Sequence, residues 1–212
     1  MEVIKSIIAQ QEQIINFALK LHANTDQIDL DPTYSKGNFY KSGIVKDPIY
    51  KSDLHPKFKD ITQSDSRYLP FKNESLKTII FDPPFVISGK TYPKSAKDNC
   101  RMAKRYSCYF SFDELKDHYY KSLKEFYRIL KPNGILIFKL QNTISSGKQH
   151  FTHFYTMKSA IDVGFYPIDE FILPMKSKVT SFGGRWNVQR HAMKYHSFFL
   201  IFKKTRCKVN YE

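Results

Sequence analysis

Apolar side chains recur at helical spacing in three parts of the chain. Residues 4–21 and 153–163 each carry an apolar stripe with a period close to that of an α-helix. A third helix is predicted to begin after Ser111, because Ser111 and Glu114 form a capping-box sequence ahead of a longer apolar stripe. The Pro-Asn-Gly sequence at 132–134 is predicted to end that helix.

Shorter apolar runs bounded by Pro, Gly or Asp predict strands. The strongest lies in residues 76–84, where the run stops at two prolines, and residues 134–141 form a second buried run. The other predicted strands lie in residues 27–37, 49–53, 60–65, 165–173 and 196–204. Helices or short crossovers separate the early strands, and two strands close the chain. We therefore expect an α/β fold with a mainly parallel sheet, an antiparallel last strand and helices on both faces.

The composition fits a single domain over residues 1–212. Hydrophobic residues make up 42% of the chain, which is enough to bury a core. The 3 cysteines form no CxxC pair, which argues against a disulfide scaffold and a structural zinc site. The N-terminal residues lack the features of a signal peptide, and no apolar run approaches the length of a membrane span. We therefore expect a cytoplasmic protein that holds no metal.

Positive charge is concentrated in two segments. The formal net charge is +14, of which residues 86–110 carry +5 and residues 174–212 carry +8, so the remainder is nearly neutral. Either run alone could be a solvated face. Two runs beside a near-neutral remainder favour a polyanion, most simply nucleic acid, over a membrane surface. We therefore expect residues 86–110 and 174–195 to be substrate-binding loops.

Both basic segments also contain aromatic side chains, as expected where phosphate contacts accompany base stacking. A plain solvent loop is the alternative for residues 86–110, and a core position is the alternative for the single tryptophan. The residues predicted to contact nucleic acid are Lys94, Lys97, Lys104, Arg105, Tyr106, Arg185, Trp186 and Arg190. The sequence specifies no Cys–His or Ser–His pairing, so the histidines are interpreted as structural.

The sequence Asp82-Pro83-Pro84-Phe85 follows the strongest predicted strand. Two consecutive prolines cannot continue a strand ladder, and they fix their own φ angles. The Asp82 carboxylate and the Pro83 carbonyl are thereby held at the carboxyl edge of the sheet, where α/β folds bind ligands. Two acceptors can grip the two N–H bonds of an exocyclic amine while the ring of Phe85 stacks on the base. All four residues are candidate catalytic residues, and a plain strand-ending turn is the alternative.

Several stretches resemble, in the expected order, the amino-methyltransferases that use S-adenosylmethionine to methylate exocyclic amines of nucleobases. FDPPF resembles their motif IV, and residues 65–85 resemble the stretch from the third strand to that motif. Residues 122–142 resemble the helix, turn and fifth strand, and residues 189–204 the final strand of small phage and bacterial DNA methylase-like proteins. The resemblance covers nearly all of the chain from about residue 26 onward. It implies a Rossmann-like class I methyltransferase sheet, S-adenosyl-L-methionine as cofactor, and a bacterial or phage-infected host cell.

The resemblance also implies a cofactor loop at residues 31–37. The family's motif I reads roughly D-P-F-x-G-x-G, whereas here Ser35 replaces the first glycine and Gly37 keeps the last. A serine can make this turn only with a negative φ or at the cost of strain. A simple turn that binds no cofactor is the alternative. The residues expected to bind the cofactor are Asp31, Pro32, Thr33, Ser35, Gly37, Asp53 and Asp65.

Two of these acids are chosen for their places at predicted strand ends. Asp53 follows Asp31 by 22 residues, a spacing from which a carboxylate can accept hydrogen bonds from ribose hydroxyls. Asp65 ends the third strand, where it can reach the adenine. Asp29 and Asp60 are less favoured alternatives. The neighbouring Lys36 could face either solvent or the methionine carboxylate.

Three functions remain open at this stage. The first is a DNA methyltransferase acting on the N6 amine of adenine, because Asp at the first position of the motif favours adenine over cytosine, as the resemblance implies. The second is an RNA or tRNA amine methyltransferase on the same fold. The third is a non-catalytic relative that binds nucleic acid without the cofactor.

Overall fold

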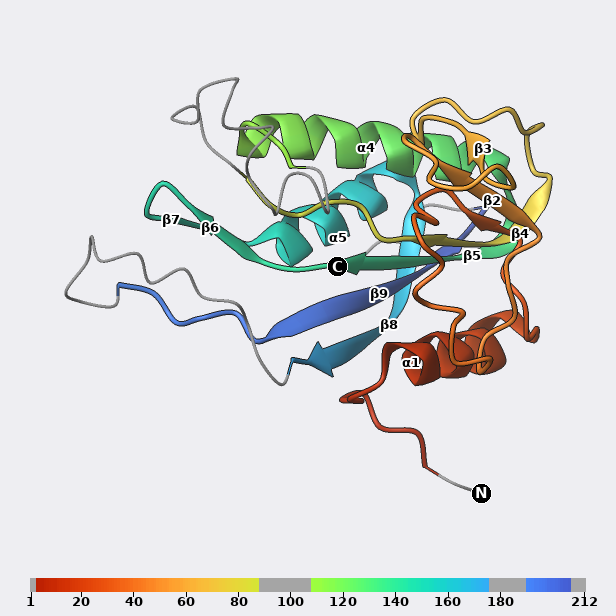
Figure 1. Ribbon diagram of the computed structural model, residues 1–212, viewed down its shortest axis with the longest axis horizontal. Coiled ribbons are helices and arrows are strands. Elements are labelled where there is room, and N and C mark those ends of the chain that lie inside the picture. The colour runs from red at the N-terminus through yellow and green to blue at the C-terminus, as the bar shows by residue number, and fades with distance from the viewer. Residues whose placement is uncertain (1–2, 88–107, 176–189, 207–212) are drawn as a thin grey trace.

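The computed structural model describes residues 3–87, 108–175 and 190–206 and centres on a seven-stranded sheet (Figure 1). The strand order is β3-β2-β1-β4-β5-β9-β8, and β9 is antiparallel to both of its neighbours, while the pairs from β3 to β5 are parallel. The strands are β1 (Leu30–Asp31), β2 (Tyr50–Asp53), β3 (Thr62–Gln63), β4 (Leu76–Phe81), β5 (Leu130–Leu140), β8 (Phe165–Pro174) and β9 (His196–Lys204). The predicted α/β sheet with an antiparallel last strand is confirmed.

Helices cover both faces of the sheet. Helices α4 (Phe112–Ile129) and α5 (Thr152–Val163) lie on one face, and α1 (Gln11–Ala18), extended by a π-helical turn η1 (Leu19–Ala23), lies on the other (Figure 1). Each face has its own buried cluster, because successive residues of a strand point to opposite sides of the sheet. In β4, Phe81 packs among the side chains of α4, whereas Ile80 packs in the cluster of α1.

Of the two predicted boundaries of α4, the first is confirmed and the second is not. The Ser111 hydroxyl accepts a hydrogen bond from the Glu114 amide (3.1 Å), and the Glu114 carboxylate accepts one from the Phe110 amide (2.7 Å). The predicted cap is therefore confirmed. The predicted turn at 132–134 is instead part of β5, which begins at Leu130 and pairs with β4 across an irregular register. Between the paired positions Leu76–Leu130 and Thr78–Ile135, β5 contains more residues than β4. Asn133, with φ of 66°, lies in this bulge, and the strand continues beyond it.

The predicted helix over residues 4–21 is wrong in its first third, because α1 begins at Gln11. The preceding residues lie against the outer edge of the sheet instead. The Ile8 amide donates to the Ile172 carbonyl (3.1 Å), and the Ile172 amide donates to the Ser6 carbonyl (2.8 Å). These bonds satisfy backbone groups of the edge strand β8, which a longer helix would leave unpaired.

A short hairpin follows β5 and was not predicted. It consists of β6 (Thr143–Ser145) and β7 (Lys148–His150), joined by Ser146 and Gly147, which both have positive φ. Two positive-φ residues between paired strands are typical of the tight hairpin turn that matches strand twist. The hairpin extends from the carboxyl end of β5 on the left of the molecule (Figure 1).

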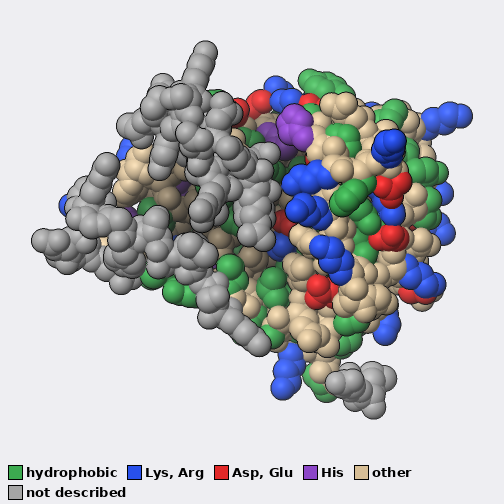
Figure 2. Space-filling model, in the orientation of Figure 1, with side chains coloured by type: hydrophobic (Ala, Val, Ile, Leu, Met, Phe, Trp, Pro, Cys, Tyr) green, Lys and Arg blue, Asp and Glu red, His purple; other side chains and the backbone are tan. Residues whose placement is uncertain are grey.

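The two ends of the sheet are built differently. Strands β1 to β3 are two to four residues long, and residues 32–49, 54–61 and 64–75 connect them and lead to β4 without a helix. On the face shown in Figure 2, acidic and basic side chains lie close together over the described surface on the right. This mixture agrees with the near-neutral charge of the chain outside its two basic segments.

Candidate active site

The carboxyl ends of β4 and β5 bring Asp82 beside a lysine. Phe81 pairs with Phe138 in parallel register, so the next residues, Asp82 and Lys139, lie side by side. The Lys139 ammonium is 2.9 Å from Asp82 Oδ2. Lys139 was not predicted as a site residue, although a charge inside the apolar run of β5 could have identified it as one.

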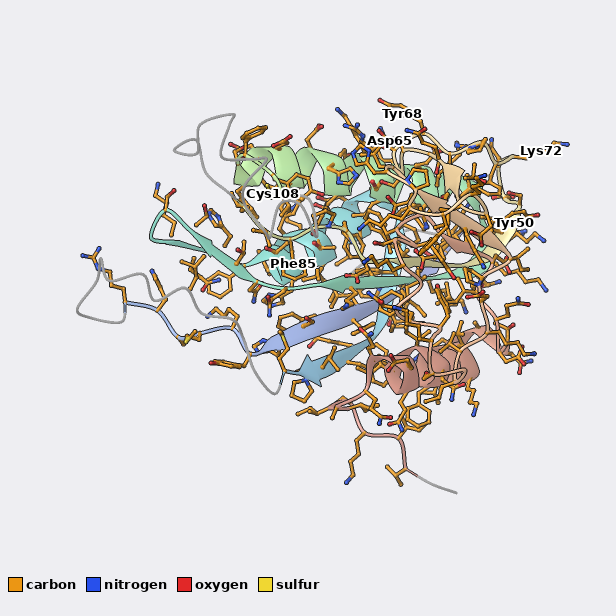
Figure 3. All side chains as sticks on the ribbon, in the orientation of Figure 1. Tyr50, Asp65, Tyr68, Lys72, Phe85 and Cys108 are labelled. Atoms are coloured by element: carbon orange, nitrogen blue, oxygen red, sulfur yellow. The ribbon has the colours of Figure 1, made fainter. Side chains whose placement is uncertain are left out.

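The Asp-Pro-Pro-Phe turn is held from the side of α4. Pro83 is buried, and the Pro84 carbonyl accepts a hydrogen bond from the Tyr119 hydroxyl (2.8 Å). The Asp82 side chain is 26% exposed, so it lies at the protein surface without being fully solvated. Phe85 is half-buried and lies well apart from Asp65 and Tyr68 (Figure 3). The turn is therefore a fixed feature with an accessible carboxylate.

One hydroxyl joins this turn to the loop that follows β1. The Asp82 amide donates to Thr33 Oγ1 (2.9 Å), and the same hydroxyl donates to Asp31 Oδ1 (3.1 Å). The Tyr40 hydroxyl donates to the other Asp31 oxygen (2.8 Å). The predicted cofactor loop and the predicted catalytic turn are thus directly connected.

Asp31 is enclosed by these contacts and is only 1% exposed. Burial raises its pKa to about 7, and the nearby Asp82 carboxylate acts in the same direction, while hydrogen bonds from Tyr40 and Thr33 oppose the rise. Its position favours a role in shaping the loop from within.

Ser35 adopts the strained alternative that the sequence left open. Its φ is 51°, and its amide donates to Asp53 Oδ2 (2.9 Å). The other Asp53 oxygen accepts from the His55 amide (2.8 Å). Each carboxylate oxygen keeps a second lone pair, so Asp53 can still accept hydrogen bonds from a diol. This remaining acceptor capacity fits the hydroxyls of a ribose.

Gly37 has a clear steric reason to be glycine. Its φ is 62°, and an added Cβ would lie 2.5 Å from the Tyr34 hydroxyl oxygen. The Tyr34 ring in turn stacks on Tyr40 with centroids 5.4 Å apart. The space left by the missing side chain is therefore filled by the loop's own tyrosine.

Asp65 is engaged elsewhere. Its carboxylate accepts hydrogen bonds from the Arg67 backbone amide and guanidinium, the closest at 2.6 Å, and this pairing lowers the pKa of Asp65. The next residue, Ser66, contacts His118 Nε2 (2.9 Å), and the Tyr109 hydroxyl contacts His118 Nδ1. Asp65 thus belongs to a polar cluster against α4, and an adenine contact would have to compete with Arg67.

Two hollows beside the loops of β1 and β2 have volumes of about 490 Å³ and 460 Å³. The first is lined by Tyr34, Lys36 and Asp47, and the second by Tyr50 and Phe71, among others. Neither is lined by Asp53 or Asp82. The chemistry of the carboxyl edge, rather than cavity size, therefore identifies the candidate site.

Most of the residues predicted to contact nucleic acid lie outside the described residues. These are Lys94, Lys97, Lys104, Arg105, Tyr106, Arg185 and Trp186. Arg190 is described and is exposed. Within the described ranges, no group of three or more His, Cys, Asp or Glu side chains is arranged to hold a metal ion, and no helix has the length and apolarity needed to cross a membrane.

Solved structures share this architecture. The protein solved in complex with the Trm112 methyltransferase activator of Haloferax volcanii aligns with a TM-score of 0.51 at 10% identity, over 95% of this chain and 92% of that one. The [4+2]-cyclase SpnF aligns with a TM-score of 0.51 at 11% identity, over 92% of this chain and 81% of that one. The cytosine-N4-specific PvuII DNA methyltransferase aligns with a TM-score of 0.47 at 22% identity, over 67% of this chain and 48% of that one.

The two alignments with a TM-score of 0.51 establish the Rossmann-like methyltransferase fold, and identities this low establish the fold alone. The chain spans about half the length of the DNA methylases that it matches. Searches of protein-family models and of curated proteins find no match.

Proposed function

We propose that this chain is an S-adenosylmethionine-dependent methyltransferase that acts on an exocyclic amine of a nucleobase, with the N6 amine of adenine in DNA as the preferred target. The observation that carries the proposal is the Asp82 carboxylate. Asp82 directly follows β4 at the carboxyl edge and is followed by two prolines, and its backbone amide donates to Thr33 in the loop after β1. Catalytic and cofactor elements of an amine methyltransferase would need this adjacency.

The chain's own residues would activate the amine by hydrogen bonding. The lone pair of an aromatic amine is delocalised into the ring, so the nitrogen is a poor nucleophile. Hydrogen bonds from its two protons to Asp82 and to the Pro83 carbonyl favour a pyramidal nitrogen with its lone pair free to attack. When bound, the cofactor would supply an electrophilic methyl group on a sulfonium, which would leave as a neutral thioether while the amine gives up one proton. Positioning and electrostatics then lower the barrier without a covalent enzyme intermediate.

The cofactor would be held mainly by Asp53 and the loop at residues 31–37. Asp53 retains acceptor capacity for ribose hydroxyls, whereas the buried Asp31 would set the shape of the loop. A contact between Asp65 and the adenine of the cofactor is the less favoured part of this proposal, because the Asp65 carboxylate is already paired with Arg67.

Nucleic acid is favoured as the substrate by charge and by exposed aromatic side chains. The net charge is +14, and two aromatic residues at the start of α5, Phe151 and Phe154, are 58% and 66% exposed. A target base in a duplex must leave the stack, and Phe85 is the proposed stacking partner for it. An RNA or tRNA amine remains the second candidate, because the same turn would accept it.

The fold alone leaves the chemistry open, since the cyclase SpnF has a similar fold. The non-catalytic alternative is tested first by calorimetric titration of the protein with S-adenosylmethionine. A folded protein that shows no binding would contradict the proposal.

The decisive experiment is single-turnover transfer of labelled methyl groups to DNA and RNA oligonucleotides at saturating cofactor. We expect transfer to adenine in DNA, and a loss of about 100-fold or more in Asp82→Ala, the usual cost of removing one preorganised electrostatic partner. Asp82→Asn should lose less, because its amide oxygen remains an acceptor. A wild-type rate in folded Asp82→Ala would remove Asp82 from the mechanism, and exclusive labelling of RNA would favour the second candidate.

A further inference from the structure

Lys139 occupies an unusual position for a cation. It lies in β5 between apolar residues, and its side chain is only 14% exposed. Its ammonium lies 5.0 Å from the ring centroid of Phe39 and 5.8 Å from that of Phe199. Besides its ion pair with Asp82, the ammonium donates to Gln11 Oε1 of α1 at 3.3 Å. The ammonium is therefore held in one place by aromatic faces and by two acceptors.

Stability gives little reason to place a lysine here. Removing an ammonium from water is costly, and a half-buried ion pair does little more than offset that cost. An apolar residue of similar volume would pack against Phe39 and Phe199 at least as well. The benefit of the pair must be sought in what it does to Asp82.

Lys139 contacts one specified oxygen of Asp82. The ion pair involves Oδ2, while the Asp82 backbone amide is fixed by Thr33 on the other side. The ammonium thereby restrains Oδ2, and Thr33 restrains the backbone of the same residue. Within the described residues no hydrogen bond occupies Oδ1, so this oxygen can accept one from an incoming group. Among the described residues, Lys139 is the cation paired with Asp82, and the neighbouring buried Asp31 adds a second carboxylate that makes a cation useful.

We propose that Lys139 is a positioning residue for methyl transfer, which orients the Asp82 carboxylate so that Oδ1 faces the target amine. The inference rests on the proposed function and adds to it a residue that acts through Asp82. It also assigns a role to the N-terminal helix, because Gln11 of α1 holds the same ammonium.

The test is a double-mutant cycle on the single-turnover rate at saturating cofactor. Lys139→Met removes the charge and keeps an unbranched side chain that is one atom shorter, and Lys139→Arg keeps the charge. In the wild-type background we expect Lys139→Met to lower the rate at least about 10-fold, and Lys139→Arg to retain it within about 3-fold. In the Asp82→Asn background, Lys139→Met should change the rate less than about 2-fold, because the carboxylate that Lys139 orients is no longer present.

The control is Lys121→Met, which removes an exposed cation of α4 that pairs with Asp117 and should leave the rate unchanged. Circular dichroism and thermal unfolding confirm that each variant folds. An equal loss in both backgrounds would show a general structural role and overturn the inference, as would a wild-type rate in Lys139→Met. A wild-type protein that transfers no methyl group to any oligonucleotide would instead overturn the proposed function, so the two failures are distinguishable.

Discussion

The two halves of the sheet are stabilised in different ways. Strands β4, β5, β8 and β9 are six to eleven residues long and pack against α4 and α5. Strands β1 to β3 are two to four residues long and are joined by loops. The half with the long strands has a deep apolar core, whereas the half with the short strands depends on side chains that hydrogen-bond to the backbone.

In the half with the short strands, many of these hydrogen bonds to the backbone are made by aspartates. Asp31, Asp53 and Asp65 each accept a hydrogen bond from the backbone amide two residues further along the chain. This is the Asx-turn geometry, in which a side chain replaces a backbone acceptor. The acids that the family resemblance assigns to the cofactor are thus also the acids that shape the loops. The comparison teaches that, in this half, the residues proposed to bind the cofactor are also the residues that shape the loops.

The largest effect is expected in the apolar half. The Phe81 ring is fully buried and contacts the rings of Tyr119, Phe126 and Phe138. Phe81→Ala should lower the free energy of unfolding by about 3–5 kcal/mol. The matched change in the other half is Tyr50→Ala, whose side chain is 48% exposed and should cost about 1 kcal/mol or less. Urea unfolding of both variants measures the difference, and equal losses would refute the contrast between the halves.

The second effect separates binding from loop structure. Asp53→Ala should weaken S-adenosylmethionine binding by roughly 1.5–3 kcal/mol, the worth of charge-assisted hydrogen bonds to the ribose. It should also release the Ser35 and His55 amides, which now donate to Asp53. Calorimetry reports the first effect and amide hydrogen exchange the second. Faster exchange with unchanged affinity would leave Asp53 a purely structural acid.

The third prediction contrasts the pH dependence of the two halves. Burial raises the pKa of Asp31 from 3.8 to about 7, so the folded state binds more protons than the unfolded chain in that range, and this group makes stability fall as pH rises. Burial lowers the pKa of His118 from 6.5 to about 4, so its contribution is lost as pH falls through that range.

Unfolding measured over this pH range in Asp31→Asn and His118→Asn tests the two signs. Asp31→Asn should make stability rise more steeply with pH than in the wild type, and His118→Asn should make it rise less steeply. Changes of the same sign in both variants would contradict the assignment.

The smallest effect concerns the strained serine. Ser35 has φ of 51°, a conformation that costs a non-glycine residue roughly 1 kcal/mol. Ser35→Gly should therefore stabilise the protein by up to about 1 kcal/mol, reduced by the greater entropy of glycine in the unfolded chain. Gly37→Ala, whose Cβ would meet the Tyr34 hydroxyl, should destabilise it. Thermal unfolding gives both signs, and a loss in Ser35→Gly would show that the serine hydroxyl matters more than the strain.

Sequence patterns predicted the apolar half best. The runs that became β4 and β9 and the cap of α4 at Ser111 are local features whose signals agree with their final packing. The first third of the predicted N-terminal helix was wrong because pairing with β8, a contact between distant residues, outweighed local periodicity. Periodicity within one segment cannot report such a contact.

The parts of the site that are local in sequence were predictable, and those that depend on contacts between distant residues were not. Asp82 and its prolines form a contiguous motif. Lys139, 57 residues further along the chain, meets Asp82 only through the register of β4 and β5. Thr33 was expected on the loop, but its bridge between Asp31 and Asp82 depends on three strands meeting at one edge. The roles assigned to these residues in binding and catalysis stay predictions.

The outer edge of the sheet bears on how the protein behaves at high concentration. A bare edge strand can template growth of the sheet from one molecule into the next. On β8, Pro167 lacks an amide donor, Asp169 and Glu170 add charge, and the backbone at Ile172 is already bonded to the N-terminal segment. The opposite edge, β3, has only two residues. These features disfavour intermolecular β-sheet growth at both edges. Removal of residues 6–8 would expose the longer edge and should make the protein more prone to aggregate.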